Sequence, residues 1–317
     1  MKRCYVGFDT SNYTTSAAVC SEEGEILANL KRPLPVREGE RGVRQSEAVF
    51  SHVRNLAPLC DELKETLDGL TPVAVGVSSR PRDGADSYMP CFLSGVAAAH
   101  AFAAASDSAV YEFSHQAGHI MAALYRSGRC EELASREFLS FHVSGGTTDV
   151  LLVTPREAGF SVECVGGSAD LHAGQVIDRV GVAMGLRFPC GREMEALATA
   201  FDGKLPRHRV TVRDGVCSLS GAENLAVKLY RETGDRQATA ALVFDFICRT
   251  LIALGEDRMS VYDRLPVLFA GGVMSNRWMR KALCEHFDAC FAPPEFSADN
   301  AAGIALLCRR RALWERI

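Results

Sequence analysis

The stretch Tyr5-Val6-Gly7-Phe8-Asp9-Thr10-Ser11 decides the fold, because an apolar run long enough for a buried strand turns polar at Asp9. A polar turn follows it, and two further strands are expected at residues 16–20 and 26–30. The chain therefore opens as a β-meander. We then expect a helix over residues 46–67, a buried strand over 73–77, an irregular segment to residue 90, and an alanine-rich helix over 92–105.

The same order of elements returns in the middle of the chain. Residues 138–143 form an apolar run, Ser144-Gly145-Gly146-Thr147-Thr148 a turn of small residues, and residues 150–154 and 161–165 two more strands. Two meander-plus-helix units predict an α/β protein with a duplicated RNase H-like core and a cleft between the copies. A late strand at residues 266–270 leads into Gly271-Gly272-Val273 and a helix.

The length of the chain favours two domains, and its net charge bears on a nucleic-acid partner. A single core stops growing at about 250–300 residues, and this chain has 317. We expect an N-terminal lobe over residues 1–110 and a C-terminal lobe over 111–317, with the final helix packing back on the first lobe. The formal charge of −4 gives no global attraction to nucleic acid, so an RNA partner would need a local basic patch.

Targeting signals and disulfides are not expected. The N-terminal apolar run is broken at Asp9, too soon for a signal peptide, and no apolar run reaches the roughly 20 residues of a membrane span. These features predict a cytoplasmic protein with no membrane partner. The twelve cysteines include no Cys-x-x-Cys pair, and Cys4, Cys20, Cys164 and Cys248 lie in apolar segments, which favours reduced core thiols.

Three turns of small residues follow predicted strands. They are Asp9-Thr10-Ser11, Val143-Ser144-Gly145-Gly146-Thr147 and Gly271-Gly272-Val273. Glycine lets main-chain N–H groups approach an anion, as a phosphate site requires. A tight turn with positive φ explains any one of them equally well, but all three in this order favour a cleft for an adenylate-type ligand.

A pair of histidines, His115 and His119, precedes an apolar helical stretch. At spacing i and i+4 both imidazoles reach one face of a helix, close enough to share a divalent metal. An incidental pair lining a helix is the competing interpretation. A third ligand would have to come from elsewhere, and Asp299 is a candidate carboxylate.

Polar residues also accompany an apolar stripe after Gly167. Asp170, Asp178 and Arg179 lie beside Val176, Ile177, Val180 and Met184, and the helix is expected to end in Phe188-Pro189-Cys190-Gly191. Such residues commonly form the solvated face of a helix. Asp178 is alternatively placed to accept hydrogen bonds from ribose, and Gly191 to let a sugar or base approach the backbone.

Together these segments resemble the TsaD family, the bacterial enzymes that make N(6)-L-threonylcarbamoyladenosine in tRNA and were once labelled O-sialoglycoprotein endopeptidases. The resemblance covers most of the chain and rests on eight motifs in the family's order. They are Gly7-Phe8-Asp9-Thr10-Ser11, His115-x-x-x-His119, Val143-Ser144-Gly145-Gly146-Thr147-Thr148, Ala173-Gly174-Gln175-x-x-Asp178-Arg179, Gly185-Leu186-x-x-Pro189-x-Gly191, Ser218-Leu219-Ser220-Gly221, Ala270-Gly271-Gly272-Val273-x-x-Asn276-Arg277 and Asp299-Asn300-Ala301-Ala302.

The resemblance implies a fold, a ligand and a reaction. The fold is that of the actin and sugar-kinase (ASKHA) superfamily, with two RNase H-like lobes. The reaction is transfer of a threonylcarbamoyl group from threonylcarbamoyl-AMP to the N6 amine of adenosine in tRNA, assisted by a metal and by partner proteins of the pathway. Iron is the first expectation for the metal, with zinc or manganese as alternatives.

The resemblance also assigns residues. His115, His119 and Asp299 match the metal ligands, and Asp9, Thr10 and Ser11 the catalytic opening turn. The positions that bind the adenylate are matched by His142, Val143, Ser144, Gly145, Gly146, Asp178, Gly191 and Asn276.

Several positions near the expected cleft depart from the family's pattern. Tyr13-Thr14 replaces an acidic pair, Thr147 a histidine, Glu223 a lysine, and residues 80–86 a Gly-Pro-Gly-Leu loop. These departures suggest a divergent paralogue. They leave open a carbamoyl or acyl transferase with another acceptor, and a nucleotide-binding protein without catalysis. A sugar or acetate kinase gives the histidines no role, and a peptidase lacks the His-Glu-x-x-His arrangement.

Overall fold

The computed structural model describes residues 2–11, 13–35, 43–84, 86–157, 159–296 and 301–315. The chain divides into two compact units. Unit 1 comprises Met1–Ser135, Thr154–Val162 and Glu295–Ile317, and unit 2 comprises Arg136–Val153 and Glu163–Pro294. Residues 111–135 and the C-terminal helix thus lie in unit 1. Each unit carries a β-sheet with helices, which confirms the α/β class.

Unit 1 contains a five-stranded sheet of order β3-β2-β1-β4-β5. The β1–β2–β3 meander is antiparallel, whereas β4 joins β1 in parallel and β5 joins β4 in parallel. The strands are β1 (Lys2–Ser11), β2 (Thr14–Ser21), β3 (Ile26–Pro33), β4 (Leu70–Arg80) and β5 (Ala109–Ser114).

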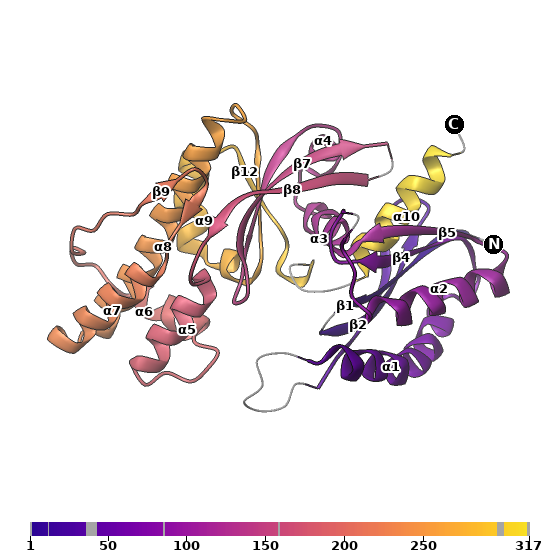
Figure 1. The fold of residues 1–317 in the computed structure, drawn as a ribbon, viewed down its shortest axis with the longest axis horizontal. Coiled ribbons are helices and arrows are strands. Elements are labelled where there is room, and N and C mark those ends of the chain that lie inside the picture. Colours follow the sequence, from indigo (N-terminus) through magenta and orange to yellow (C-terminus); the bar gives the residue numbers. More distant parts are fainter. Residues whose placement is uncertain are drawn as a thin grey trace. The chain divides into compact units, whose positions relative to one another are not determined.

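Helices cover both faces of this sheet (Figure 1). On one face, α1 (Gln45–Thr66) packs on β2 and β3, and α2 (Phe92–Ser106) packs on β1 and β4. On the other, α10 (Ala302–Trp314) crosses β1, β2 and β4 and packs against α3 (His115–Leu124). The short α4 (Cys130–Leu133) follows α3.

The contact between β1 and α10 requires glycine in the strand. A Cβ atom on Gly7 would lie 2.5 Å from the Ala305 nitrogen and 2.7 Å from the Ala301 oxygen. Because both neighbours are main-chain atoms, neither can move aside alone. Gly7 therefore lets the last helix lie directly against the strand that carries Asp9.

Unit 2 contains a seven-stranded sheet of order β12-β11-β6-β7-β8-β10-β9. Its strands are β6 (Phe138–Val143), β7 (Thr148–Arg156), β8 (Gly159–Ser168), β9 (Val212–Arg213), β10 (Val216–Cys217), β11 (Val267–Ala270) and β12 (Ala289–Phe291). β6 is antiparallel to β7 and parallel to β11, so a second β-hairpin again begins a sheet with parallel strands.

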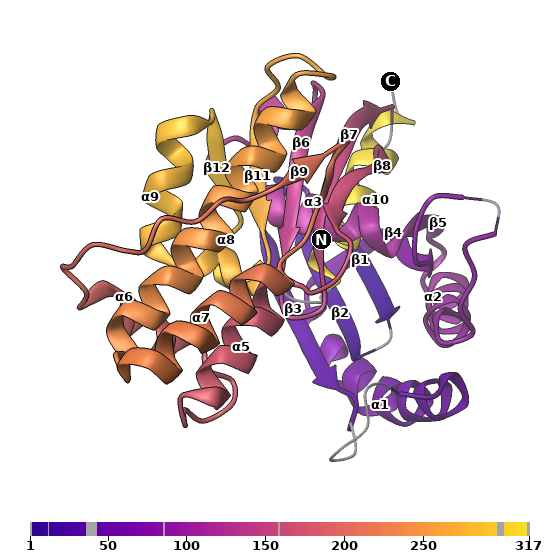
Figure 2. The same cartoon turned by 60° about the vertical axis from the view of Figure 1, so that its left-hand side comes forward.

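The helices of unit 2 gather into a layer around α8 (Figure 2). Their apolar faces form one core with the inner sides of β6 and β11. The helices are α5 (Ala173–Ala183), α6 (Gly191–Thr199), α7 (Ser220–Thr233), α8 (Arg236–Met259) and α9 (Arg277–His286), with the 3-10 turn η1 (Gly272–Ser275). A second 3-10 turn, η2 (Pro294–Phe296), begins at the last residue of unit 2 and continues into unit 1.

Most predicted elements are confirmed, with three corrections. The expected helix after Gly167 is α5, which begins only at Ala173, so Asp170 lies in the preceding turn. Gly191 does not end that helix but begins α6. All twelve cysteines are free, as predicted, but Cys164 is exposed, because the middle of β8 faces solvent.

One helix among the described residues, α8, is long and apolar enough by composition to cross a membrane. Of its most apolar window, 78% is buried inside the protein. The buried residues of α8 belong to the core of unit 2, which accounts for their apolar character.

Candidate functional site

Residues 9–11, which the sequence predicted as a turn, are instead the last three residues of strand β1 and pair with Thr14–Ser16 of β2, because the strand continues past the change to polar residues. Asp9, Thr10 and Ser11 are each no more than 3% exposed. The Ser11 amide donates to Asp9 Oδ1 over 2.8 Å, so one carboxylate oxygen is engaged at the end of β1. The Thr10 hydroxyl donates to the Cys91 carbonyl and accepts from the Gly95 amide, each over 3.0 Å, and thereby ties β1 to α2.

The second oxygen of Asp9 meets the predicted metal helix. Asp9 Oδ2 lies 2.6 Å from His115 Nδ1. His115 is the first residue of α3, where the Ser114 hydroxyl caps the helix by accepting from the Ala117 amide. One turn later, the His119 ring lies 4.2 Å from the His115 ring, measured between centroids. The sequence thus correctly predicted that the two histidines share one helix face.

Two imidazoles beside a carboxylate are the types of ligand that suit a divalent metal ion of borderline softness. A carboxylate on Nδ1 orients the ring and leaves Nε2 for the metal, as in many metal sites. The third predicted ligand, Asp299, lies outside the described residues. In the part of the chain that is described, no three His, Cys, Asp or Glu side chains are grouped to hold a metal. His115 and His119 therefore remain a candidate pair that needs a further ligand.

In unit 2, the turn after β6 packs against the N-terminus of α5. The Gly174 amide donates to the Ser144 carbonyl over 3.1 Å, and a Cβ on Gly174 would lie 2.6 Å from Gly145 Cα. The Ala173 amide donates to the Thr148 hydroxyl over 2.9 Å. Local hydrogen bonds and a glycine contact therefore bring the predicted phosphate turn to the N-terminus of α5, and these bonds engage the first two amides of the helix.

A cavity of about 650 Å³ in unit 2 collects four of the predicted adenylate residues. They are Gly145, Asp178, Gly191 and Asn276, which come from four separate segments. Ile177, Phe244 and Val273 add apolar surface, and Arg192, Glu193 and Glu195 add charge. The other predicted ligand residues, His142, Val143, Ser144 and Gly146, belong to the end of β6 and the same turn, but are not among the lining residues.

Asp178 and Asn276 each use one polar atom to hold the cavity together. Asp178 Oδ1 accepts from the Cys190 amide over 2.7 Å and so fixes the start of α6. Asn276 Oδ1 accepts from the Met279 amide over 2.8 Å and caps α9. Within the described ranges, no other hydrogen bond engages the second Asp178 oxygen or the Asn276 Nδ2 group, which leaves an acceptor and a donor for a ligand.

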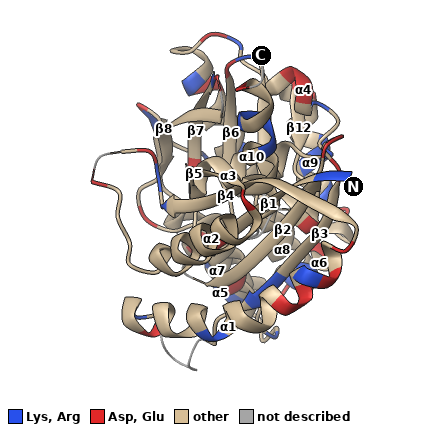
Figure 3. Cartoon of the chain, turned by 90° about the vertical axis from the view of Figure 1, so that its right-hand side faces the viewer, with Lys and Arg blue, Asp and Glu red and all other residues tan. Residues whose placement is uncertain are grey.

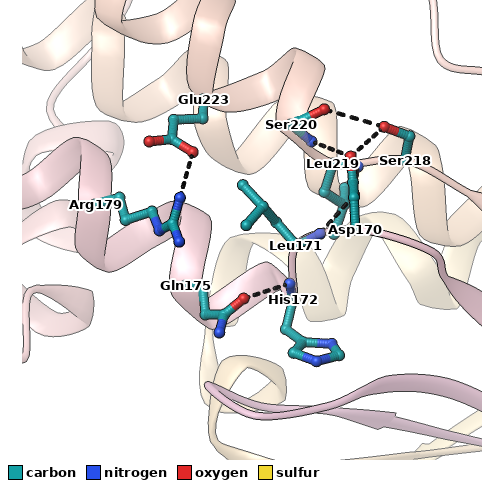
Figure 4. Close-up of polar contacts among 9 residues, drawn as sticks. All are labelled: Asp170, Leu171, His172, Gln175, Arg179, Ser218, Leu219, Ser220 and Glu223. Atoms are coloured by element: carbon teal, nitrogen blue, oxygen red, sulfur yellow. Dashed lines mark hydrogen bonds and ion pairs between the residues drawn. The ribbon is translucent and has the colours of Figure 1, made fainter. Parts of the chain in front are cut away.

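Two structural carboxylates were missed by sequence reasoning. Glu195 Oε1 accepts from the Arg277 amide over 2.9 Å, which joins α6 to the first turn of α9. Asp170, which the sequence placed on a solvated helix face, instead caps the start of α7 (Figure 4). Its carboxylate accepts from the hydroxyls of Ser168 and Ser218 and from the amides of Leu171, Leu219 and Ser220.

These hydrogen bonds set the ionisation of Asp170. Burial opposes the charged form, but the donors at Ser218, Ser220, Leu219 and Leu171 outweigh it and lower the pKa of the carboxyl well below its ordinary value. The motif Ser218-Leu219-Ser220-Gly221 is therefore, at least in part, a helix start held by a carboxylate.

A charge pair lies on the neighbouring helices. Arg179 of α5 lies 3.3 Å from Glu223 of α7 (Figure 4). The position where the family usually has a lysine thus carries an anion that neutralises the adjacent arginine.

A larger cavity of about 770 Å³ lies in unit 1, along β5 and beside Pro155, Phe160 and Arg311. It contains none of the residues that the sequence predicts for catalysis, ligand or metal. The basic run Arg309–Arg311 along α10 (Figure 3) is also engaged within unit 1. Arg309 donates to the Glu22 carbonyl, Arg310 to the Ala134 carbonyl and Arg311 to the Glu315 carboxylate.

Several solved structures share this fold. Full-length HypF, bound to phosphate and nucleotide, matches 98% of this chain with a TM-score of 0.59 at 12% identity, over 46% of its own length. The ROK hexokinase of Thermus thermophilus matches with a TM-score of 0.52 at 16% identity, covering 98% of this chain and 99% of that one. These likenesses show the fold of the chain, which is the two-sheet α/β fold that the sequence predicted.

Comparison of the sequence with known families identifies the family of this chain. The family model of the tRNA N6-adenosine threonylcarbamoyltransferases, TsaD, matches residues 26–306. A protein of that name from Streptococcus thermophilus (strain CNRZ 1066) is 30% identical over 319 residues, covering 96% of this chain and 90% of that protein. One from Streptococcus suis (strain 05ZYH33) is 29% identical over 322 residues, covering 96% and 91%. The chain belongs to the TsaD family, which confirms the resemblance.

Proposed function

We propose that this protein transfers the threonylcarbamoyl group of threonylcarbamoyl-AMP to the N6 amine of adenosine in tRNA. The observation that carries the proposal is the cavity that gathers Gly145, Asp178, Gly191 and Asn276. Family membership supports the same activity, because the curated relatives carry this name. The proposal places the protein in the cytoplasm and includes partner proteins of the same pathway.

The unit 2 cavity would hold the adenylate. The second oxygen of Asp178 would accept from ribose hydroxyls. Gly145 and Gly191, which both have open space where a Cβ would lie, would let phosphate and sugar approach the main chain. Ile177, Phe244 and Val273 would provide apolar contact for the base. With the adenylate fixed in this way, positioning rather than a covalent enzyme intermediate supplies the catalysis.

In the transfer, the adenosine amine forms a C–N bond to the carbamoyl carbon. The C–O bond to phosphate breaks, AMP leaves, and the amine loses a proton. His115, His119 and Asp299 would hold a divalent metal, iron in the first instance. When bound, such a metal supplies positive charge for a phosphate or carbonyl oxygen. Asp9 would orient His115 through their 2.6 Å contact, and Thr10 and Ser11 would fix the end of β1 that carries Asp9.

One observation favours a second candidate, transfer to a different acceptor. Glu223 neutralises Arg179 through the 3.3 Å contact, so the cationic pair expected from the family pattern is absent at this position. A polyanion such as tRNA gains less binding free energy from this neutral pair than it would from two cationic side chains. A small acceptor would be less affected.

The test is incubation of purified protein with threonylcarbamoyl-AMP and unmodified tRNA, with and without the pathway's partner proteins. Nucleoside mass spectrometry should detect threonylcarbamoyladenosine. Asp178→Asn keeps an acceptor for the Cys190 amide but replaces the free oxygen, and should weaken adenylate binding about tenfold or more, as loss of a hydrogen bond to a charged group does. Asp214→Asn is the control, because that side chain is 92% exposed.

Unchanged adenylate binding in Asp178→Asn would refute the assignment of the unit 2 cavity as the adenylate site. A copurified adenylate with no transfer to tRNA, but transfer to a small amine, would establish the second candidate. Adenylate binding without transfer to any acceptor would instead indicate a non-catalytic paralogue.

A further inference from the structure

An arginine of α9 joins two main-chain carbonyls in unit 2. Arg280 Nε donates to the Met274 carbonyl over 2.7 Å, and Arg280 Nη2 donates to the Ala292 carbonyl over 3.2 Å. The central carbon of the guanidinium also lies 4.8 Å from the centroid of the Phe291 ring. A planar guanidinium carries five N–H donors in a fixed geometry, so one side chain can hold two acceptors at once.

The two carbonyls belong to segments that follow neighbouring strands. Met274 lies in η1, which comes after β11, and Ala292 directly follows β12. The strands β11 and β12 are parallel, and the Ala292 amide donates to the Phe269 carbonyl of β11 over 2.9 Å. The helix α9, which carries Arg280, lies beside both β12 and η1 (Figure 2). Arg280 therefore ties the turn η1 to the end of the sheet.

The turn η1 forms part of the wall of the unit 2 cavity. The residues of the turn and its C-terminal neighbour that line this cavity are Gly272, Val273, Ser275 and Asn276. Just before the turn, Gly271 has a φ of +99°, and a Cβ there would lie 2.3 Å from the Val143 oxygen at the end of β6. The start of the turn is thus fixed against β6, and the Met274 carbonyl within it is held by Arg280.

The charge of Arg280 is directed at the main chain. Within the described ranges, its guanidinium meets two carbonyls and one ring, and no carboxylate pairs with it. Hydrogen bonds from an ionised donor are stronger than neutral ones. We propose that Arg280 is a positioning residue for the ligand of the unit 2 cavity. Its bridge between the Met274 and Ala292 carbonyls holds η1 in the place where the turn meets the ligand, an inference that rests on the proposed function.

Two substitutions separate the bridge from the charge. Arg280→Met keeps an unbranched apolar stem and removes every donor. Arg280→Lys keeps the charge and a donor, but a single ammonium group does not reproduce the planar fork that holds two carbonyls. Lys281→Met is the matched control for charge, because Lys281 is an exposed cation on the same helix. Phe291→Leu is the control for stability, since it removes the ring contact and leaves both hydrogen bonds of Arg280.

The kinetics distinguish positioning from stability. Arg280→Met should raise KM for threonylcarbamoyl-AMP about tenfold and leave kcat unchanged, as loss of binding shared by ground state and transition state does. A protein that is merely less stable loses active molecules, which lowers the apparent kcat and leaves KM unchanged. Arg280→Lys should give an intermediate KM. Both controls should keep the wild-type KM, although Phe291→Leu should melt at a lower temperature.

Three kinetic results would overturn the proposal. They are an unchanged KM in Arg280→Met, an equal rise of KM in either control, and a wild-type KM in Arg280→Lys, which would show that charge alone suffices.

Hydrogen exchange tests the bridge without any activity. The Met274 and Asn276 amides close η1 through bonds to the Gly271 and Val273 carbonyls. Both amides should exchange about tenfold faster in Arg280→Met than in the wild type, while the amides of α8 keep their rates. Unchanged exchange at the turn, or equal acceleration in α8, would also overturn the proposal. If the wild type transfers nothing to tRNA, the proposed function fails, whereas exchange at η1 still decides whether Arg280 holds the turn.

Discussion

Replacement of Asp170 by asparagine tests the polar junction at the start of α7. The carboxylate accepts from five donors, three of them main-chain amides. The residues of all these donors except Ser168 are drawn in Figure 4. Asparagine keeps one oxygen but turns the other into an NH2 donor. Whichever way the amide points, it then faces the Ser220 amide on one side or the Leu171 and Leu219 amides on the other.

The magnitude follows from the number of bonds lost. A hydrogen bond to a charged group contributes about 1.5–3 kcal/mol when well shielded. Because Asp170 is exposed and water competes for its donors, we take about 2 kcal/mol for the whole change. In a unit of about 150 residues, this lowers Tm by about 4–8 °C.

The assay is thermal unfolding followed by fluorescence. The chain has two tryptophans, so Trp314→Phe leaves Trp278 of α9 as a reporter of unit 2. The matched control is Asp214→Asn in the same unit, at an aspartate with a 92% exposed side chain. The control should melt like the parent protein.

Acid should abolish the difference in stability between the parent protein and Asp170→Asn. The folded-state pKa of Asp170 lies below its ordinary value of 3.8, so the charged form contributes stability above that pH, and this stability is lost as pH falls through the folded-state value. The gap between parent and Asp170→Asn should thus be full at neutral pH and shrink below about pH 4. Equal melting at neutral pH, or a gap that persists in strong acid, would refute the reasoning.

Two further substitutions test other parts of the structure. Gly7→Ala should cost about 1–3 kcal/mol, because the new methyl group meets main-chain atoms of α10; Gly84→Ala, with open space around it, is the control in a Trp314-detected melt. Glu223→Lys should release Arg179 and tighten tRNA binding. The slope of log binding constant against log salt concentration should become steeper by about one to two units. Glu232→Lys on the same helix controls for net charge, and equal gains in the two variants would contradict the local explanation.

The sequence predicted the elements better than their polar connections. Apolar runs ending in small polar residues located β1, β6 and β11, and the spacing of His115 and His119 located α3. Those signals are local. The partners of Asp170 at residues 218–220 lie about 50 residues away, so no local pattern could distinguish a helix cap from a solvated side chain.

The same limit applies within the candidate site. The motifs identified Asp178 and Asn276. Their hydrogen bonds to the Cys190 and Met279 amides could not be predicted, because these bonds depend on where α6 and α9 begin.

The most direct test of the central claim is a single-turnover measurement with purified protein, radiolabelled threonylcarbamoyl-AMP, unmodified tRNA and the pathway's partner proteins. We predict that label appears in tRNA as threonylcarbamoyladenosine and that Asp178→Asn slows its appearance at limiting adenylate. Label that stays in the adenylate or is released only by hydrolysis, under conditions in which the Streptococcus thermophilus relative modifies the same tRNA, would contradict the account.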